Sequence, residues 1–401
     1  MYDLIVVGGG AAGFFGAIQF AEQRPESRII ILEKSNKVLS KVKVSGGGRC
    51  NVTHACFDPA EMVEHYPRGA KELRGPFHRF LCGDMMAWLA DQGVETKIES
   101  DGRVFPVSDS SQTIIDCFLK KCEKHRITVQ KQEAVKQLTP QERLWRIQTA
   151  SGTLDAKHVL LATGSTPSVW NMLGDMGYEI VDPVPSLFTF NIKHKMIEGL
   201  PGLSMPQSEV EVIGTSLKES GPLLITHWGL SGPAILKLSA WGARELHALN
   251  YRFQIRVNWL GMEKGSVLDT IDQERSSNPK RVVKKYPQFG MARRLWERFC
   301  YMAKLYDANW ASLSREQMDR FVEYLTASTF EVDGKSTFKE EFVTCGGIDR
   351  KQIDFRTMES KLHPGLYFAG EVIDIDAITG GFNFQAAWTE AVIGAESMSS
   401  L

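Results

Sequence analysis

The glycine-rich segment Gly8-x-Gly10-x-x-Gly13 constrains the fold of this chain more than any other feature. It follows a short apolar run, "LIVV", and precedes a stretch with helical periodicity. A second apolar run, "RIIILEK", places Glu33 20 positions after the third glycine. A strand, a glycine turn, a helix and a strand ending in an acidic residue are typical of dinucleotide-binding βαβ units. The chain is therefore predicted to open with such a unit.

The chemistry of this turn indicates which part of a dinucleotide it meets. A glycine lets the backbone approach a pyrophosphate, and the free N–H groups at a helix start favour negative charge. An acidic residue at the end of the second strand accepts hydrogen bonds from ribose hydroxyls. A βα turn without a ligand is the alternative, and context and spacing disfavour it. The predicted contacts of this motif are Gly8, Gly10, Ala11, Ala12, Gly13, Glu33 and Lys34.

Two later segments favour FAD over NAD as the dinucleotide. Residues 127–164 are predicted to form a β-meander that ends in "LLATG", an arrangement that resembles the two-dinucleotide-binding flavoproteins. The C-terminal "GLYFAGEVIDIDAITGGFNFQAAW" resembles the second FAD motif of that class. Its last helix would direct its N-terminus at the flavin edge that gains negative charge on reduction. The predicted contacts are Ala134, Val135, Ala162, Thr163, Gly164, Gly370, Glu371, Asp376, Gly380, Gly381, Phe382 and Asn383.

A second glycine run, Gly46-Gly47-Gly48, is followed directly by Arg49, Cys50 and Asn51. Glycines allow main chain to lie against a ring or a pyrophosphate, so these six residues are predicted to line the cofactor. Arg49 would offset a phosphate or a substrate carboxylate, and Asn51 would contact the flavin edge. Cys50 is interpreted as a small buried residue, with a thiol at the ring as the alternative. The alternative interpretation of this glycine run is a flexible surface loop.

Several long motifs together resemble the BaiN/YhiN-type flavoproteins, described as NAD(P)/FAD-dependent or aminoacetone-oxidase-like enzymes. They include "KVSGGGRCNVT", "DGRVFPVSDSS", "ITHWGLSGPAILKLSA", "TCGGI" and "TMESK", and they extend over almost the whole chain. The resemblance implies an α/β fold, with a glutathione-reductase-like Rossmann FAD-binding domain that carries an inserted β-barrel and a helical segment. The expected domains are 1–190 with 345–401, 191–262 and 263–344. The short "STPSVWNMLGDMG" departs from many relatives and puts the transfer of a substrate in doubt.

The predicted insertion contains one further candidate for chemistry. "RFQIRVNWL" alternates apolar and polar residues, as half-buried strands do, and Ser314-x-x-Gln317 is a capping box before a helix. His227 lies at a turn between a strand and a helix and is a candidate acid–base group. A structural histidine beside a Gly-Pro turn is the more common case. The basic pairs between 280 and 294 are interpreted as a solvated face, with a nucleic-acid or acidic-partner surface as the alternative.

Composition excludes some classes of protein and partner. Lysine plus arginine number 47 and aspartate plus glutamate 48, which makes a nucleic-acid partner bound by bulk charge unlikely. No apolar run approaches the roughly 20 residues that span a bilayer, and the N-terminus lacks a signal-peptide pattern. Seven cysteines without a C-x-x-C pair argue against disulfides and a metal site. A cytoplasmic protein without bound metal is expected.

The predicted function is that of an FAD-dependent oxidoreductase that transfers hydride at flavin N5 to or from a small organic substrate. NAD(P)H is the candidate reductant, although the chain contains no second GxGxxG. The catalytic candidates are Arg49, His227 and Asp376. A flavin-holding scaffold or redox-sensing partner protein with little turnover, and an FAD monooxygenase, are the alternatives. The sequence leaves the substrate, the direction of hydride flow and the oligomeric state open.

Overall fold

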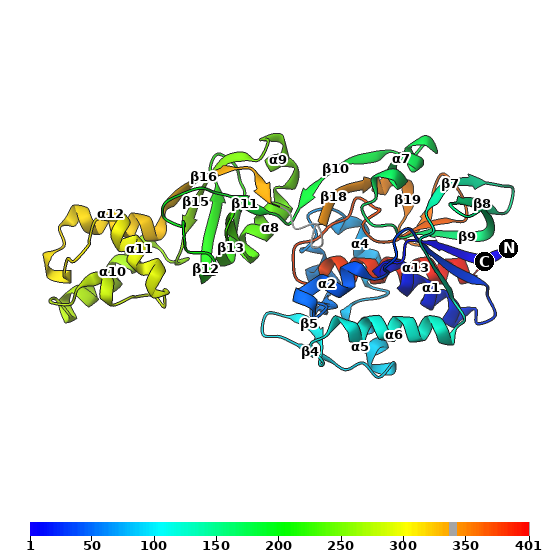
Figure 1. The fold of residues 1–401 in the computed structure, drawn as a ribbon, viewed down its shortest axis with the longest axis horizontal. Helices are drawn as coiled ribbons and strands as arrows, with labels where there is room; N and C mark the ends of the chain where they lie inside the picture. The colour runs from blue at the N-terminus through cyan, green and yellow to red at the C-terminus, as the bar shows by residue number, and fades with distance from the viewer. Residues whose placement is uncertain (337–342, 401) are drawn as a thin grey trace. The chain divides into compact units, whose positions relative to one another are not determined.

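Parallel strands from both ends of the chain form the sheet of the first of two units. The computed structural model describes residues 1–336 and 343–400. Unit 1 comprises residues 1–185 and the described residues from 343 onward, and unit 2 comprises the described residues from 186 onward to 336. Figure 1 shows unit 1 in blue to green and in orange to red, and unit 2 mainly in green to yellow. The colours thus show that unit 2 is inserted, along the sequence, between the two parts of unit 1.

The predicted βαβ unit is confirmed at the N-terminus. β1 (Tyr2–Val7) is followed by α1 (Ala11–Gln23) and β2 (Ile29–Glu33). β1 pairs in parallel with β2, with Leu4 opposite Ile29, and on its other side with β9 (Thr153–Leu161). Because helices cover both faces of such a sheet, its strands are continuous apolar runs, and Leu4, Ile5 and Val6 are fully buried.

The C-terminal segment completes this sheet. The strand order is β19-β20-β21-β9-β1-β2-β6, and β21 and β6 pair in parallel with their neighbours β9 and β2. β7 and β8 add an antiparallel extension to β9, which confirms the predicted meander. The further strands of this sheet are β6 (Thr128–Lys131), β7 (Val135–Pro140), β8 (Trp145–Thr149), β19 (Ile353–Asp354), β20 (Glu359–Ser360) and β21 (Leu366–Phe368).

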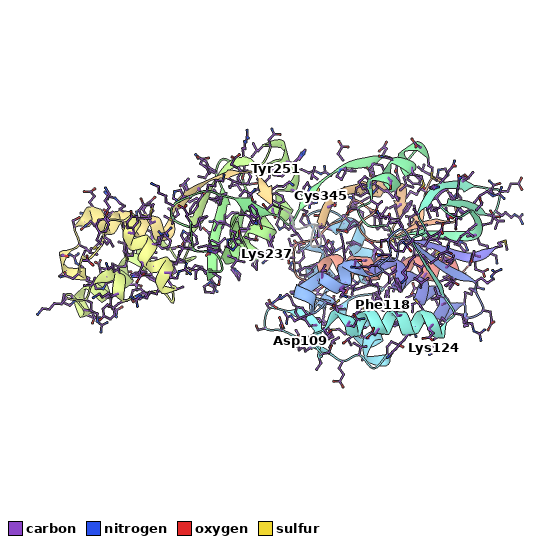
Figure 2. All side chains as sticks on the ribbon, viewed as in Figure 1. Asp109, Phe118, Lys124, Lys237, Tyr251 and Cys345 are labelled. Atoms are coloured by element: carbon purple, nitrogen blue, oxygen red, sulfur yellow. The ribbon has the colours of Figure 1, made fainter. Side chains whose placement is uncertain are left out.

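An aromatic cluster joins the helices on one side of the sheet. Phe15 of α1 lies 4.9 Å from Trp88, 6.0 Å from Phe118 and 5.4 Å from Trp388, measured between ring centroids. These partners belong to α5 (Cys82–Asp91), α6 (Ser111–Lys124) and α13 (Phe382–Ser400), and Phe118 is labelled in Figure 2. Edge-to-face aromatic pairs of this kind stabilise packing beyond their buried area. They fix α13 against α1, which matters for the site.

Short elements surround the sheet of unit 1. β3 (Thr53–His54), β5 (Arg103–Pro106) and β4 (Thr96–Ile98) form a small antiparallel sheet in the order β3-β5-β4. β10 (Ile180–Ser186) pairs with β18 (Val343–Ile348). The remaining elements of unit 1 are α2 (Ser40–Gly48), α3 (Pro59–Val63), α4 (Ala70–Phe77), α7 (Pro167–Asp175) and the short 3₁₀ helix Arg350–Gln352.

Unit 2 contains a seven-stranded antiparallel sheet in the order β16-β15-β12-β13-β14-β11-β17. The predicted alternation is confirmed in β15, where Phe253, Ile255 and Val257 are buried between exposed neighbours. The expected β-barrel corresponds to this sheet, in which β16 pairs with β15 and β17 pairs with β11. The sheet begins with β16 and ends with β17, two strands separated in the chain by Gly334 alone. The strands are β11 (Thr189–Asn191), β12 (Ser204–Val212), β13 (Lys218–Ile225), β14 (Gly229–Ser231), β15 (Arg252–Asn258), β16 (Ser328–Asp333) and β17 (Lys335–Ser336).

A helical block is inserted between β15 and β16 (Figure 1). The predicted capping box is present, since the Ser314 hydroxyl accepts from Gln317 N at 3.1 Å and Gln317 Oε1 accepts from Ser314 N at 3.0 Å. Helices and sheet share one hydrophobic core, in which Trp259 lies 5.6 Å from Phe299. The expected division at residue 262 therefore falls inside a continuous core. The helices of the block are α10 (Lys264–Ser277), α11 (Arg293–Met302), α12 (Arg315–Thr326) and the 3₁₀ helices Val283–Lys285 and Trp310–Ser312. Two further helices, α8 (Pro233–Trp241) and α9 (Ala243–Ala248), lie between β14 and β15.

The described residues contain neither a helix that could span a membrane nor a cluster of metal-binding side chains. Every helix among residues 1–336 and 343–400 is too short or too polar to traverse a lipid bilayer. Within the same ranges, His, Cys, Asp and Glu side chains form no group of three or more that could hold a metal ion.

Candidate functional site

The first glycine turn is tightly packed on one side and open on the other. A Cβ built at Gly8, whose φ is +112°, would lie 2.4 Å from the carbonyl oxygen of Ala162. A Cβ at Gly13 would lie 2.0 Å from the carbonyl oxygen of Gly8. At Gly10, by contrast, no described protein atom lies within 4 Å of the Cβ position. Packing therefore explains two of the glycines, while Gly10 lines open space at the start of α1, where a pyrophosphate would be held.

Glu33 closes the end of β2 beside this turn. Its carboxylate accepts hydrogen bonds from Gly9 N and Ser35 N, both at 2.8 Å. A carboxylate has about four acceptor positions, so capacity for ribose hydroxyls remains. The Glu33 carbonyl accepts from Glu133 N at 2.8 Å, which places the predicted contacts Ala134 and Val135 directly after this junction. Lys34 contacts the hydroxyl of Thr166 at 3.3 Å, and Thr166 follows the predicted Thr163-Gly164 turn.

The second glycine run has a left-handed backbone. The φ angles of Gly46, Gly47 and Gly48 are +57°, +70° and +85°, and α2 loses its helical geometry at Ser45. Such a series strongly favours glycine. No described atom lies within 4 Å of a Cβ placed at Gly47, so this backbone also borders open space.

The residues after the run have different environments. Cys50 is fully buried, and burial raises the pKa of its thiol to about 12, so it is an unreactive small side chain at neutral pH. Asn51 is 8% exposed, and its Oδ1 has no hydrogen-bond partner among the described residues. Buried polar atoms are nearly always satisfied, so an orphan oxygen at this position fits a polar ligand edge.

The start of α13 lies directly against the segment that follows the second glycine run. Gly381 has a φ of +97°, and a Cβ there would lie 2.5 Å from the carbonyl of Thr53. Thr53 Oγ1 donates to Gln385 Oε1 at 2.6 Å, and Trp388 Nε1 donates to Val52 O at 2.9 Å. These partners are 332 and 336 positions apart in the sequence. The structure thus brings together the second glycine run and the C-terminal motif, two of the segments predicted to line one cofactor.

The loop before α13 is held by buried polar contacts. Asn383 clamps Ala377, donating to its carbonyl at 3.0 Å and accepting from its N–H at 2.9 Å. Gly370 N donates to Glu390 Oε2 at 2.6 Å, and burial raises the pKa of Glu390 to about 8. Glu371 forms an ion pair with Lys41 through Oε2, while its Oε1 has no partner among the described residues. The orphan oxygens of Glu371 and Asn51, together with the open positions at Gly10 and Gly47, fit a polar cofactor such as FAD.

The three catalytic candidates have different local environments. The guanidinium of Arg49 is paired with Glu99 at 2.6 Å and with Asp109, which Figure 2 labels, at 3.4 Å. Asp376 is fully buried and forms a two-pronged ion pair with Arg68. His227 belongs to unit 2 and is exposed in the turn between β13 and β14. Arg49 and Asp376 thus carry charges that neighbouring side chains already neutralise, which does not support an acid–base role for either.

Two histidines that the sequence reasoning missed lie at the start of α13. His54 and His65 stack on the ring of Phe382, with centroid distances of 4.5 and 4.1 Å. His54 Nδ1 is 3.1 Å from the carbonyl oxygen of Gly380, and His65 O accepts from Ile378 N at 3.0 Å. Both are partly exposed. No sequence motif connects them to Phe382, since only tertiary packing brings β3, which contains His54, and the segment after α3, which contains His65, to the start of α13.

Comparisons with known proteins agree with this geometry. The family described as "HI0933-like protein Rossmann domain" matches residues 2–397. A ribosomal RNA dihydrouridine synthase of Escherichia coli (strain K12) is 27% identical over 97% of this chain and 96% of its own length. A 3-dehydro-bile acid delta(4,6)-reductase of Clostridium scindens is 23% identical over 96% of this chain and 95% of its own length.

A solved structure shares the fold. The 3-ketosteroid-delta4-(5alpha)-dehydrogenase of Rhodococcus jostii RHA1 superposes with a TM-score of 0.52 and 13% identity, covering 99% of this chain and 96% of the other. At this low identity, the similarity shows a shared fold only. The chain therefore belongs to the HI0933-like family, as the motif-based resemblance predicted, and it is a flavin-dependent oxidoreductase with a Rossmann-type FAD-binding domain.

Proposed function

We propose that this protein reduces a carbon–carbon double bond conjugated to a carbonyl group, with FAD as the resident cofactor and NAD(P)H as the reductant. The names of the full-length relatives support this reaction type. A dihydrouridine synthase saturates the C5=C6 bond of uracil, which is conjugated to the C4 carbonyl, and a delta(4,6)-reductase of a 3-dehydro-bile acid reduces double bonds conjugated to the 3-oxo group. The two substrates differ greatly in size, but the reacting atoms are alike.

The observation that carries the proposal is the anchoring of the α13 start against β3. The 380–383 turn is fixed by Thr53, by the Tyr66 hydroxyl, which donates to Phe382 O at 2.5 Å, and by Asn383. The N–H groups of the first helical turn have no partners within the helix, and together with the helix dipole they favour negative charge. A rigid helix start stabilises charge that develops beside it without reorganisation. Bound FAD would supply the hydride to the β-carbon of the conjugated system.

The reaction also needs a proton at the neighbouring carbon, and the chain offers a source near α13. His54 and His65 are the titratable side chains stacked on Phe382. Imidazole is the group whose ordinary pKa is best matched to proton transfer near neutral pH. The Gly380 carbonyl beside His54 Nδ1 would fix the orientation of the His54 ring. We assign the proton-donor role to this histidine pair in preference to Arg49 and Asp376.

Anaerobic spectroscopy tests the proposal. The purified protein should show a flavin spectrum that bleaches on titration with NADH or NADPH. Addition of 2-cyclohexenone or uridine without oxygen should restore the oxidised spectrum, whereas cyclohexene, whose double bond is not conjugated, should not. A flavin that NAD(P)H reduces but only oxygen reoxidises would refute the proposal and favour the scaffold. An oxygen adduct of the reduced flavin would favour a monooxygenase.

A further inference from the structure

A strongly basic segment of unit 2 begins after α10 and extends through α11. Residues 280–304 contain eight lysine and arginine residues and one acidic residue, Glu297, in a chain whose net charge is −1. The near-zero total charge therefore conceals a local excess. Figure 1 shows the helical block with α11, to which the second half of this segment belongs.

Several of these cations have hydrogen-bond or ion-pair partners inside unit 2. Arg294 donates to the carbonyl of Gly199 at 2.6 Å, Arg298 donates to the carbonyl of Lys195, and Arg293 pairs with Glu297 at 2.8 Å. These cations of α11 hold neighbouring segments in place. Arg281 pairs with Glu274 at 3.5 Å, and Lys284 pairs with Asp307 at 2.6 Å. Lys280 and Lys285, by contrast, are exposed and form no ion pair within 4 Å among the described residues, although Asp307 interacts with Lys285 at longer range.

These two lysines border an open hollow. It has a volume of about 450 Å³ and is lined by Ser277, Asn278, Pro279, Lys280, Arg281, Val282, Lys285 and Tyr286. The Tyr286 ring is 44% exposed, and the guanidinium carbon of Arg281 lies 4.8 Å from its centroid. Cations beside an exposed aromatic ring are the combination that binds a nucleic-acid strand, because the cations pair with phosphates and the ring stacks on a base.

We propose that this hollow, with Lys280, Arg281, Lys285 and Tyr286, binds a single-stranded segment of RNA. The inference rests on the proposed function, since RNA presents a conjugated double bond in each uracil. Lys280 and Lys285 pair with consecutive phosphates, and Tyr286 stacks on a base, backed by Arg281. The positive charge would also attract an acidic protein, but such a protein has no base that could stack on the exposed Tyr286 ring. Further exposed rings follow in the same block, with Tyr301 61% and Tyr306 54% exposed.

The test measures binding of a fluorescein-labelled U15 RNA by anisotropy, with the full-length flavoprotein and its variants, at several salt concentrations. Lys280→Ala/Lys285→Ala should weaken binding about tenfold or more at low salt and reduce the salt slope by roughly 0.7 for each lysine. Tyr286→Ala should weaken binding by about five- to 150-fold with an unchanged salt slope. Thermal melting checks that each variant is folded.

A matched control removes the same charge from the other unit. Lys120 and Lys124 of α6 are exposed and have no carboxylate partner among the described residues, and Lys124 is labelled in Figure 2. Lys120→Ala/Lys124→Ala should bind U15 like the unchanged protein. Equal losses in both double variants, or no loss in either, would overturn the proposed surface. Competition by poly-glutamate as effective as by unlabelled U15 would overturn it in favour of an acidic protein.

Flavin measurements on the same samples separate this inference from the proposed function. All variants should retain the flavin spectrum and its reduction by NAD(P)H, because the changed residues lie outside unit 1 or on the exposed face of α6. RNA binding that is unaffected by the hollow variants, with normal flavin reduction, would refute the surface alone. A protein that neither binds flavin nor is reduced would refute the proposed function, whatever its affinity for RNA.

Discussion

Gly10→Ala separates the cofactor role of the first glycine turn from its packing role. The Cβ position at Gly10 has no described protein atom within 4 Å, and the backbone is extended, with φ −94° and ψ −167°. Alanine can adopt this conformation. Reduced freedom of the unfolded chain stabilises the variant by about 0.4–1 kcal/mol, and a poorer N-cap offsets this by a similar amount. The free energy of unfolding of the apo-protein should therefore change by less than about 0.5 kcal/mol.

FAD affinity should respond very differently. A methyl group placed where the pyrophosphate approaches the backbone acts as overpacking, which costs about 1–3 kcal/mol. That cost corresponds to a Kd raised roughly 5- to 150-fold. Gly13→Ala is the contrasting change, since its Cβ would lie 2.0 Å from the Gly8 carbonyl oxygen and the backbone must shift. A cost of about 3 kcal/mol lowers the melting temperature by roughly 6–12 °C.

The assay combines thermal unfolding of apo-protein by circular dichroism with FAD titration by fluorescence quenching. Gly10→Ala should melt like the unchanged apo-protein and bind FAD weakly, whereas Gly13→Ala should melt early even without FAD. The reasoning fails if Gly10→Ala binds FAD with unchanged affinity, because the open space at Gly10 would then not be the pyrophosphate site. It also fails if the two variants lose the same stability.

Three further predictions concern buried groups of unit 1. Asp376→Asn removes the carboxylate of the buried two-pronged pair with Arg68 and should cost about 3–5 kcal/mol in chemical denaturation. Asp155→Asn, which breaks an exposed pair, should cost less than about 1 kcal/mol, and equal losses would refute the structural role of the buried pair. Burial raises the pKa of Glu390 to about 8 from 4.5, so the folded state binds the extra proton and stability should fall as pH rises from about 4.5 to 8. Glu390→Gln should flatten that dependence in melting curves, and an unchanged slope would contradict the assignment. All seven cysteines are buried, and burial raises the pKa of Cys50 to about 12. DTNB at pH 8 should therefore label no cysteine quickly in the native protein and all seven in guanidinium. A fast-reacting thiol in the native protein would contradict this burial.

Local patterns predicted the elements whose determinants lie close together in the chain. The βαβ unit, the meander, the alternation in β15 and the capping box at Ser314 are confirmed, because each depends on residues only a few positions apart or on one short repeat. The strand order of the expected β-barrel does not follow from such patterns. Strand alternation shows which face of a strand is buried, but not whether the last strand of a sheet pairs with the first. The net charge of the chain does not reveal the basic segment either, because it averages over all residues.

The residues of the candidate site also fall into two groups, those that local spacing predicts and those that only tertiary contacts bring together. Gly8, Gly10, Gly13 and Glu33 follow from spacing alone, because one turn and its helix create the pyrophosphate environment from adjacent residues. The partners of Arg49 and Asp376, and the stacking of His54 and His65 on Phe382, depend on contacts between segments distant in the chain. The sequence by itself determined the type of cofactor-binding unit, since backbone conformation at glycines is a local property. Only the tertiary structure decided which charged and titratable side chains remain available at that unit, because long-range packing neutralises some and brings others together.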